Sequence, residues 1–159
     1  MDLEDKDLIL ANIISEKAQE RGSQEVLTFV KIDDKGSFHD ERRSYFALWE
    51  NGHKVAHQLL DEGMAQGDSF AIIMQNHPEF VDTMVGSSIL GTIFVPIDPR
   101  TKGKKLAFML NHADCKGAVV GDYAIDNLNE IISACPNLKW IWLIGSDREI
   151  PIRKKNFSE

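Results

Sequence analysis

The sequence predicts an α/β fold with a mostly parallel sheet and helices on both of its faces. From residue 44 onward, a helix pattern is followed by a short strand pattern four times over. The run from Phe70 to Met74 is apolar throughout, as in strands that are covered on both faces. Neither a repeat nor a linker interrupts this alternation, which is typical of helices that cross over between parallel strands.

The composition is that of a globular protein with one domain. The chain has 159 residues, of which 43% are apolar and 27% charged. The formal net charge of −7 argues against nucleic acid as a partner, because an acidic surface repels phosphate groups. The most apolar run, Met84 to Ile97, is too short to span a bilayer. The acidic start is unlike a signal peptide, so we expect a cytoplasmic protein.

The chain before residue 44 predicts a helix and a hairpin. Residues 8–21 carry apolar side chains at three- and four-residue spacing, and Gly22 follows at the expected helix end. The β-branched and aromatic run from Val26 to Ile32 predicts a strand. After the turn-forming residues 33–36, the segment 38–43 is expected to return as a polar edge strand.

Two long helices follow. Ser44 is a typical N-cap for a helix that runs to about Glu62, with Gly63 at its end. The next helix, through Leu90, is expected to begin at a capping box formed by Asn76 and Glu79. The predicted buried stripe of the first helix is Tyr45, Leu48, Trp49, Ala56, Leu59 and Leu60. The second helix is apolar on most sides, and its Gly86 would let another backbone approach closely.

The remaining chain continues the alternation. Strands are expected at 93–97, 118–120 and 140–144. The helices between them are expected over 101–112, with Thr101 as the cap and Leu106, Met109, Leu110 and Ala113 inside, and over 123–134, with Leu128, Ile131 and Ile132 inside. The charged end of the chain, 146–159, is expected to be a loose tail.

Ligands of open parallel sheets bind beyond the carboxyl ends of the strands, so a site is expected in the turns after Met74, Ile97 and Val120. His77 follows the first of these strands and could act as a base, although a residue at a helix start needs no such role. Asp98 could be a carboxylate base, or it could accept backbone hydrogen bonds in its own turn.

A basic cluster lies just beyond Asp98. It consists of Arg100, Lys102, Lys104 and Lys105 at an expected helix start. Cations at this end of a helix are mildly unfavourable, because the helix dipole favours anions there. The cluster is therefore either an anion site, such as one for phosphate, or a solvated surface patch.

Other residues that could carry chemistry have simpler structural explanations. His53 and His57 share a helix face, but no third metal ligand is evident. Cys115 and Cys135 have no activating partner at a recognisable spacing and are expected in the core of a protein from a reducing compartment. The sequence contains no glycine-rich phosphate loop and no G-x-S-x-G motif. From the residues alone, we predict no catalytic residue and no metal site.

Three segments resemble the AMP-forming adenylating enzymes, which include acyl-CoA synthetases and the adenylation domains of peptide synthetases. The segment 44–50, SYFALWE, is similar to the family's S/T-Y-x-E-L helix start, with Ala47 in place of glutamate. The segment 63–80 resembles the family's G-V-x-x-G-D-x-V-A-I-x-x-x-N-x-P-E-F. The segment 90–100, LGTIFVPIDPR, is similar to L-G-A-v-x-V-P-i-n-P-r. The three occur in the family's order and spacing, and the resemblance covers roughly residues 8–145.

The resemblance implies a two-step reaction. A carboxylic acid reacts with ATP and Mg²⁺ to give an acyl-adenylate, and a thiol, usually that of coenzyme A, then displaces AMP. The family's T-S-G-T-T-G-x-P-K-G phosphate loop and its C-terminal domain with the catalytic lysine have no counterpart here, so we expect an N-terminal portion that is inactive by itself. ATP, Mg²⁺ and coenzyme A are expected for the full-length enzyme, and none of them is expected to bind tightly to this portion. One binding residue carries over: Arg100 matches an arginine that contacts the 3′-phosphate region of coenzyme A in some ligases of this family. Asp98 replaces the family's asparagine, and the Lys-Gly-Lys-Lys stretch replaces acidic residues.

Several alternatives stay open at this point. Within the family, the V-P-I-D-P-R stretch fits ligases of small or medium acids, including the crotonobetaine/carnitine type. A peptide-synthetase adenylation domain is a near relative, and a free-standing non-catalytic module that binds a nucleotide or a partner is the hypothesis from another class. A phosphate loop encoded beyond Glu159 would favour the ligase. The apolar helix at 84–90 also predicts exposed apolar surface and self-association.

Overall fold

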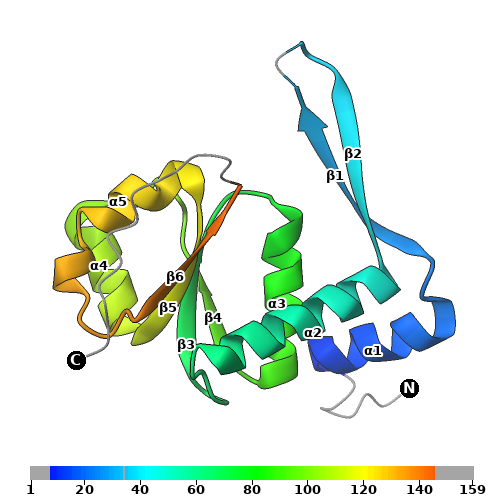
Figure 1. Ribbon diagram of the computed structural model, residues 1–159, viewed down its shortest axis with the longest axis horizontal. Coiled ribbons are helices and arrows are strands. Elements are labelled where there is room, and N and C mark those ends of the chain that lie inside the picture. The colour runs from blue at the N-terminus through cyan, green and yellow to red at the C-terminus, as the bar shows by residue number, and fades with distance from the viewer. Residues whose placement is uncertain (1–7, 34, 146–159) are drawn as a thin grey trace. The chain divides into compact units, whose positions relative to one another are not determined.

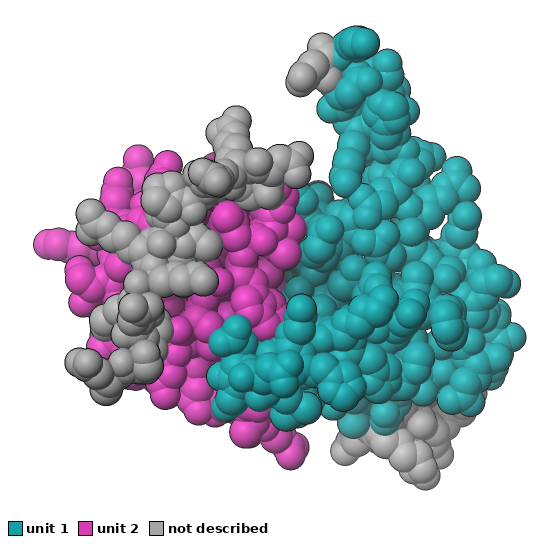
Figure 2. Space-filling model, in the orientation of Figure 1, with its two compact units in different colours: residues 1–63, 76–91 teal, residues 64–75, 92–159 magenta. Residues whose placement is uncertain are grey.

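The computed structural model describes residues 8–33 and 35–145. These residues form two compact units, each built from two stretches of chain (Figure 2). Unit 1 comprises residues 1–63 and 76–91, and unit 2 comprises residues 64–75 and 92–159. The predicted loose tail, 146–159, lies outside the described residues.

Unit 1 contains three helices and a two-stranded antiparallel ribbon (Figure 1). The helices are α1 (Leu10–Arg21), α2 (Tyr45–Asp61) and α3 (Pro78–Leu90), and the strands are β1 (Glu25–Ile32) and β2 (Phe38–Ser44). Its core contains Ile14, Leu48 and Val85, one from each helix. The predicted hairpin is confirmed: Val30 pairs with Asp40, and the Gly36 N–H donates to the Asp33 carbonyl across the turn.

The two long helices of unit 1 approach each other closely at glycines. A Cβ on Gly86 would lie 2.5 Å from Cγ1 of Val55 and 2.9 Å from the carbonyl oxygen of Gly52. A Cβ on Gly52 would likewise lie 2.5 Å from Cγ1 of Val85. The close backbone approach predicted at Gly86 is therefore confirmed, with α2 as the partner.

The start and end of α2 lie where the sequence predicts them, but one residue of its predicted buried stripe is exposed. Ser44 Oγ accepts a hydrogen bond from the Ala47 N–H at 3.2 Å, and Gly63 has a left-handed φ of 77°. Leu60 was predicted to be buried and is 50% exposed. The neighbouring Leu59 is fully buried, and the next residue of a helix points about 100° away from it.

Both of the other predicted N-caps are wrong. In α3 the N-cap is His77, which makes no side-chain capping bond, and Pro78 is the first helical residue. A residue before proline is disfavoured in the helical region, so His77 stays extended and a box starting at Asn76 cannot form. In α4 (Gly103–His112) the N-cap is Lys102 instead of Thr101. Thr101 instead closes the preceding turn by donating its N–H to the Asp98 carbonyl.

Unit 2 is a parallel four-stranded sheet with helices, so the predicted α/β fold class is confirmed. Its strands, β3 (Ser69–Ile73), β4 (Ile93–Pro96), β5 (Cys115–Gly121) and β6 (Trp140–Ile144), lie in the order β4-β3-β5-β6. The helices α4 and α5 (Ile125–Asn129) lie on one side of the sheet (Figure 1). They share a core with side chains of the two central strands, including Ala71, Ile73, Ala118 and Val120.

The helix predicted over 123–134 is broken into three short pieces. The α-helical part, α5, lies between 3₁₀ turns at Asp122–Ala124 and Ile132–Ala134. Leu128 and Ile131 are nevertheless buried as predicted. The segment is rich in poor helix formers, among them Asn127 and Asn129, which explains why the apolar spacing does not sustain one continuous helix. No helix among the described residues is long and apolar enough to cross a membrane.

Candidate functional site at the carboxyl edge of the sheet

The carboxyl ends of the strands of unit 2 are level with one another. Ile72 of β3 pairs with Pro96 of β4, and Ile73 of β3 pairs with Val120 of β5. The turns that the sequence selected, after Met74, Ile97 and Val120, therefore leave the sheet along the same edge. This edge is where a parallel sheet places its ligand site.

The strand order contains a switch point between the two central strands. From β3 the chain goes on to β4 on one side, whereas from β5 it goes on to β6 on the other. Tyr123 lies at the end of this strand pair, where its hydroxyl oxygen accepts a hydrogen bond from the Gln75 N–H. A Cβ on Gly121 would lie 2.6 Å from Cζ of Tyr123, so a glycine is needed for the ring to take this position.

Sequence reasoning missed Tyr123 as a residue of this edge. The available signal was a glycine followed two residues later by an aromatic side chain, directly after a buried strand. Burial of the hydroxyl raises the pKa of Tyr123. The side chain therefore stays protonated near neutral pH and can donate a hydrogen bond while it accepts the one from Gln75.

The turn after β4 is held by Asp98. The Thr101 N–H donates to the Asp98 carbonyl at 2.9 Å, with Pro99 at the second position of the turn. The Arg100 N–H donates to Oδ1 of Asp98 at 2.9 Å. The structural role predicted for Asp98, acceptance of backbone hydrogen bonds in its own turn, is thus confirmed. Asn127 of α5 donates to the Pro99 carbonyl at 3.1 Å and ties this turn to the helix.

The side chain of Arg100 is paired with Asp98. Nε donates to Oδ1 at 3.0 Å, and Nη2 donates to Oδ2 at 2.6 Å. The Arg100 side chain is 86% exposed, so the guanidinium group faces solvent. Hydrogen bonds from the Arg100 side chain and backbone, with a smaller contribution from Lys105, lower the pKa of Asp98 to about 2. Such a weak base cannot accept protons near neutral pH, which argues against Asp98 as a catalytic base.

The lysines of the basic cluster follow this turn in the sequence and are exposed. Lys102 is the N-cap of α4, and Lys104 and Lys105 belong to its first turn. Their exposure is compatible with an anion site and with a solvated patch, the two alternatives that the sequence left open.

The histidines singled out in the sequence belong to unit 1, and both cysteines are buried. His53 packs edge-on against Trp49, with ring centroids 4.3 Å apart, and within residues 8–33 and 35–145 no group of three side chains could hold a metal ion. His77 belongs to unit 1, as the N-cap of α3. Cys115 and Cys135 are free and buried, and burial above all raises the pKa of Cys115 to about 12, so it behaves as a core residue.

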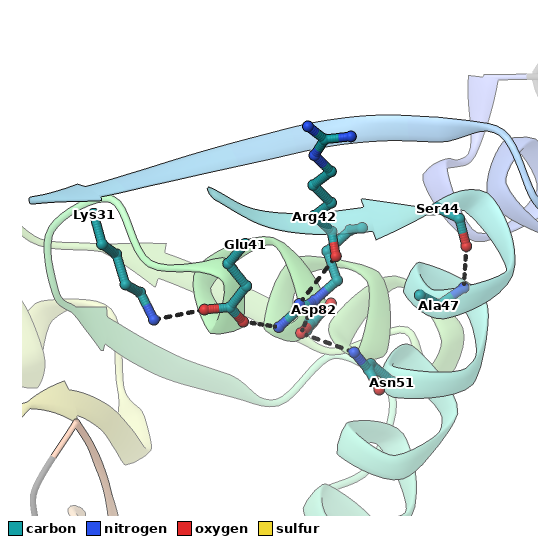
Figure 3. A network of polar contacts seen from close by, with 8 residues as sticks. Lys31, Glu41, Arg42, Ser44, Ala47, Asn51 and Asp82 are labelled. Carbon is teal, nitrogen blue, oxygen red and sulfur yellow. Dashed lines mark hydrogen bonds and ion pairs between the residues drawn. The ribbon is translucent and has the colours of Figure 1, made fainter. Parts of the chain in front are cut away.

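A second polar feature that sequence reasoning missed lies inside unit 1. Asp82 of α3 is 5% exposed, and its Oδ2 receives hydrogen bonds from Nε of Arg43 at 3.3 Å and Nδ2 of Asn51 at 3.1 Å. Arg43 also contacts Glu41, which pairs with Lys31 (Figure 3). Burial raises the pKa of Asp82, against the lowering effect of Arg43. This network joins β2, α2 and α3 and has a structural role.

Comparison with known proteins identifies the family. Residues 14–157 match the family model described as AMP-binding enzyme. The chain belongs to the AMP-binding enzyme family. This match covers all of the helix–strand alternation and therefore confirms the family resemblance carried by the segments 44–50, 63–80 and 90–100.

Individual members of this family show how much of an AMP-binding enzyme the chain represents. It is 31% identical over 94 residues to 4-hydroxybutyrate–CoA ligase 2 of Metallosphaera sedula, covering 59% of this chain and 17% of that enzyme. It is 31% identical over 100 residues to surfactin synthase subunit 2 of Bacillus subtilis, covering 61% of this chain and 3% of that protein. The chain thus spans less than a fifth of the length of these relatives.

A solved structure shows the same fold. A long-chain-fatty-acid-CoA ligase from Archaeoglobus fulgidus matches with a TM-score of 0.75 and 20% identity, covering 87% of this chain and 28% of that one. At this identity the likeness establishes the fold alone. The described units therefore have the architecture found in part of a longer AMP-binding enzyme.

Proposed function

We propose that this chain is the N-terminal part of an ATP-dependent acid–CoA ligase. The observation that carries the proposal is the match of residues 14–157 to the AMP-binding family. The similarity to a 4-hydroxybutyrate–CoA ligase supports the ligase branch of that family. The reaction is the activation of a carboxylic acid by ATP, followed by its transfer to coenzyme A.

The proposed chemistry has two displacement steps. A carboxylate oxygen of the acid attacks the α-phosphorus of ATP, which forms the acyl-adenylate and releases pyrophosphate. The thiol sulfur of coenzyme A then attacks the acyl carbon, and AMP leaves. Mg²⁺ bound by the whole enzyme would neutralise charge that develops on the phosphate oxygens. The acid we propose is a small or fatty carboxylic acid, and the crotonobetaine/carnitine type is the narrower proposal from the 95–100 segment.

Arg100 is the residue of this chain that we propose for ligand binding, as a contact to the 3′-phosphate of coenzyme A. Its guanidinium group is exposed at the carboxyl edge of the sheet, next to the lysines of the basic cluster. Guanidinium groups bind phosphate oxygens through two parallel N–H bonds. The exposed position and the positive charge of Arg100 support this role.

We further propose that the 159-residue chain does not form adenylates by itself. Its sequence contains no glycine-rich loop to hold the phosphates of ATP. The test is ATP–pyrophosphate exchange by the purified chain with Mg²⁺ and a panel of small and fatty acids. We expect no exchange above the rate without protein, and exchange that depends on the acid would contradict the proposal.

A peptide-synthetase adenylation domain is the second candidate, because surfactin synthase subunit 2 is as similar in identity as the ligase. The coding sequence beyond Glu159 distinguishes the two. A phosphate loop followed by a carrier-protein domain would favour the synthetase, and a phosphate loop without one would favour the ligase. A stop codon directly after Glu159 would favour a free-standing binding module.

Two further properties are proposed on physical grounds. The buried free thiols of Cys115 and Cys135 suit a reducing compartment, so we propose that the protein works in the cytoplasm. The exposed apolar surface that the sequence predicted for the helix at 84–90 is not found there, because each of these residues is buried or half-buried. We still propose that the isolated chain self-associates, because Val30, Ile32 and Phe38 are large apolar side chains that are more than half exposed on the β1–β2 ribbon. Sedimentation velocity at increasing protein concentration measures this directly, and a strictly monomeric species would contradict it.

A further inference from the structure

The side chains of Asp98 and Arg100 are already hydrogen-bonded to each other in the turn that follows β4. Nε and Nη2 of Arg100 donate to the two carboxylate oxygens at 3.0 and 2.6 Å. The Arg100 N–H also donates to Oδ1, which fixes the carboxylate at this position. Nε and Nη2 form one of the donor forks by which a guanidinium group binds a carboxylate or a phosphate. The Asp98 carboxylate therefore occupies a fork that an incoming anion would use.

We infer that Asp98 is a specificity-determining residue that competes with the ligand phosphate for Arg100. The inference rests on the proposed function of Arg100 as a phosphate contact. A phosphate binds Arg100 either by displacing the carboxylate or by using the remaining edge of the guanidinium group beside a fixed negative charge. In both cases the nearby carboxylate opposes the binding of an anion.

This competition acts most strongly on one chemical class of ligand. A terminal phosphate monoester carries a charge of about −1.5 to −2 at pH 7, whereas a carboxylate or a phosphate diester carries one negative charge. The fixed charge of Asp98 therefore opposes a terminal monoester more strongly than a ligand that lacks one. Asp98 thus limits the preference of the site for a terminal monoester, such as the 3′-phosphate of coenzyme A, and its removal should raise that preference.

The exposure of Asp98 and Arg100 determines how much Asp98 weakens the binding of a phosphate. The side chain of Asp98 is 47% exposed and that of Arg100 is 86% exposed. Exposed ion pairs are weak, so Asp98 lowers affinity without blocking the site. We expect Asp98→Asn to tighten the dissociation constant for coenzyme A by about two- to five-fold. The same substitution should leave the affinity for dephospho-coenzyme A almost unchanged.

The experiment is calorimetric titration of the 159-residue chain with coenzyme A and with dephospho-coenzyme A at fixed ionic strength. The variants are Asp98→Asn and Arg100→Gln. Asp61→Asn is the matched control, because it makes the same change in net charge at an exposed residue of α2, in the other unit. We expect Asp98→Asn to be the only variant that binds coenzyme A more tightly than the wild type. Arg100→Gln should lose the preference for coenzyme A over dephospho-coenzyme A, and Asp61→Asn should bind both ligands as the wild type does.

The outcomes separate this inference from the proposed function. If coenzyme A and dephospho-coenzyme A bind alike, or if neither binds, the proposed contact at Arg100 is wrong and the inference fails with it. If the preference for coenzyme A depends on Arg100 but Asp98→Asn binds no more tightly than the wild type, only the inference is overturned. Equal tightening by Asp61→Asn would assign the effect to net charge and would also overturn it.

Discussion

Arg43 of β2 and Asp82 of α3 meet inside unit 1, with 3.3 Å between Nε and Oδ2. Only 15% of the Arg43 side chain and 8% of the Asp82 side chain are exposed. A buried charge is costly unless it is paired and hydrogen-bonded, and each residue supplies this partner to the other. The pair thus connects the β1–β2 ribbon to the helices and gives the ribbon a fixed position on α3.

Removal of Asp82 should destabilise unit 1. Asp82→Ala leaves the Arg43 guanidinium mostly buried with Glu41 as its remaining ion-pair partner. We expect the free energy of unfolding to fall by about 3 kcal/mol, the lower end of the range of about 3–5 kcal/mol for a buried pair that loses one member. Urea denaturation followed by circular dichroism measures this change.

Glu50→Ala is the matched control for this substitution. It removes an exposed ion pair with Lys54 on α2, whose atoms are 3.4 Å apart. The control should change the free energy of unfolding by less than about 0.5 kcal/mol. Equal changes in the free energy of unfolding would show that the Arg43–Asp82 pair contributes no more to stability than an exposed ion pair does.

The raised pKa of Asp82 predicts a pH dependence with a definite sign. Because burial raises this pKa above 3.8, the folded state binds the proton more tightly than the unfolded chain does. The stabilising contribution is therefore complete below about pH 3.8 and is lost as the pH rises through the raised pKa. Asp82→Asn lacks this titration, so its stability relative to the wild type should increase over that pH window and then level off.

The measurement is urea denaturation of both proteins at closely spaced pH values from acid to neutral. A difference between wild type and Asp82→Asn that does not change with pH would contradict the raised pKa. Asp98→Asn provides a contrast of opposite sign. The pKa of Asp98 is lowered to about 2, so the contribution of its carboxylate is present above pH 3.8 and lost as the pH falls toward 2.

Tyr123 should hold the turn after β3 through one hydrogen bond. Tyr123→Phe removes the oxygen that accepts the Gln75 N–H while it keeps the aromatic ring. A bond of this kind contributes about 1 kcal/mol, so the Gln75 amide should exchange with solvent deuterium about five times faster. Hydrogen exchange read by NMR resolves this single amide. Tyr45→Phe, on α2 of the other unit, should leave the exchange rate at Gln75 unchanged.

Much of the fold could be predicted because apolar periodicity determines which segments pair and pack. The strand Trp140–Ile144 and the Ser44 N-cap occur at the predicted residues. The helix starts at Pro78 and Gly103 could not be placed by capping patterns alone. In both cases the backbone next to a proline or within a turn decides where the helix begins, and a pattern of side-chain types does not contain that information.

The candidate site was predictable only as a location. The rule for parallel sheets selected the edge at which the strands end level with one another, and a family resemblance selected Arg100. The contacts that shape the edge depend on tertiary structure, because Tyr123 meets Gln75 and Asn127 meets Pro99 across 48 and 28 residues of sequence. Asp82 was missed for a similar reason. Its partners Arg43 and Asn51 come from other elements, and a single aspartate in an apolar helix gives no indication of them.

The central proposal, that the turn at Arg100 receives the 3′-phosphate of coenzyme A, is tested most directly by NMR of the ¹⁵N-labelled chain. Coenzyme A and dephospho-coenzyme A are added separately while backbone amides and the arginine Nε–H signals are followed. We expect shifts at Arg100 Nε and at residues 98–105 with coenzyme A, and much smaller ones with the dephosphorylated form. Equal shifts with both ligands, or shifts elsewhere with none at Arg100, would contradict it.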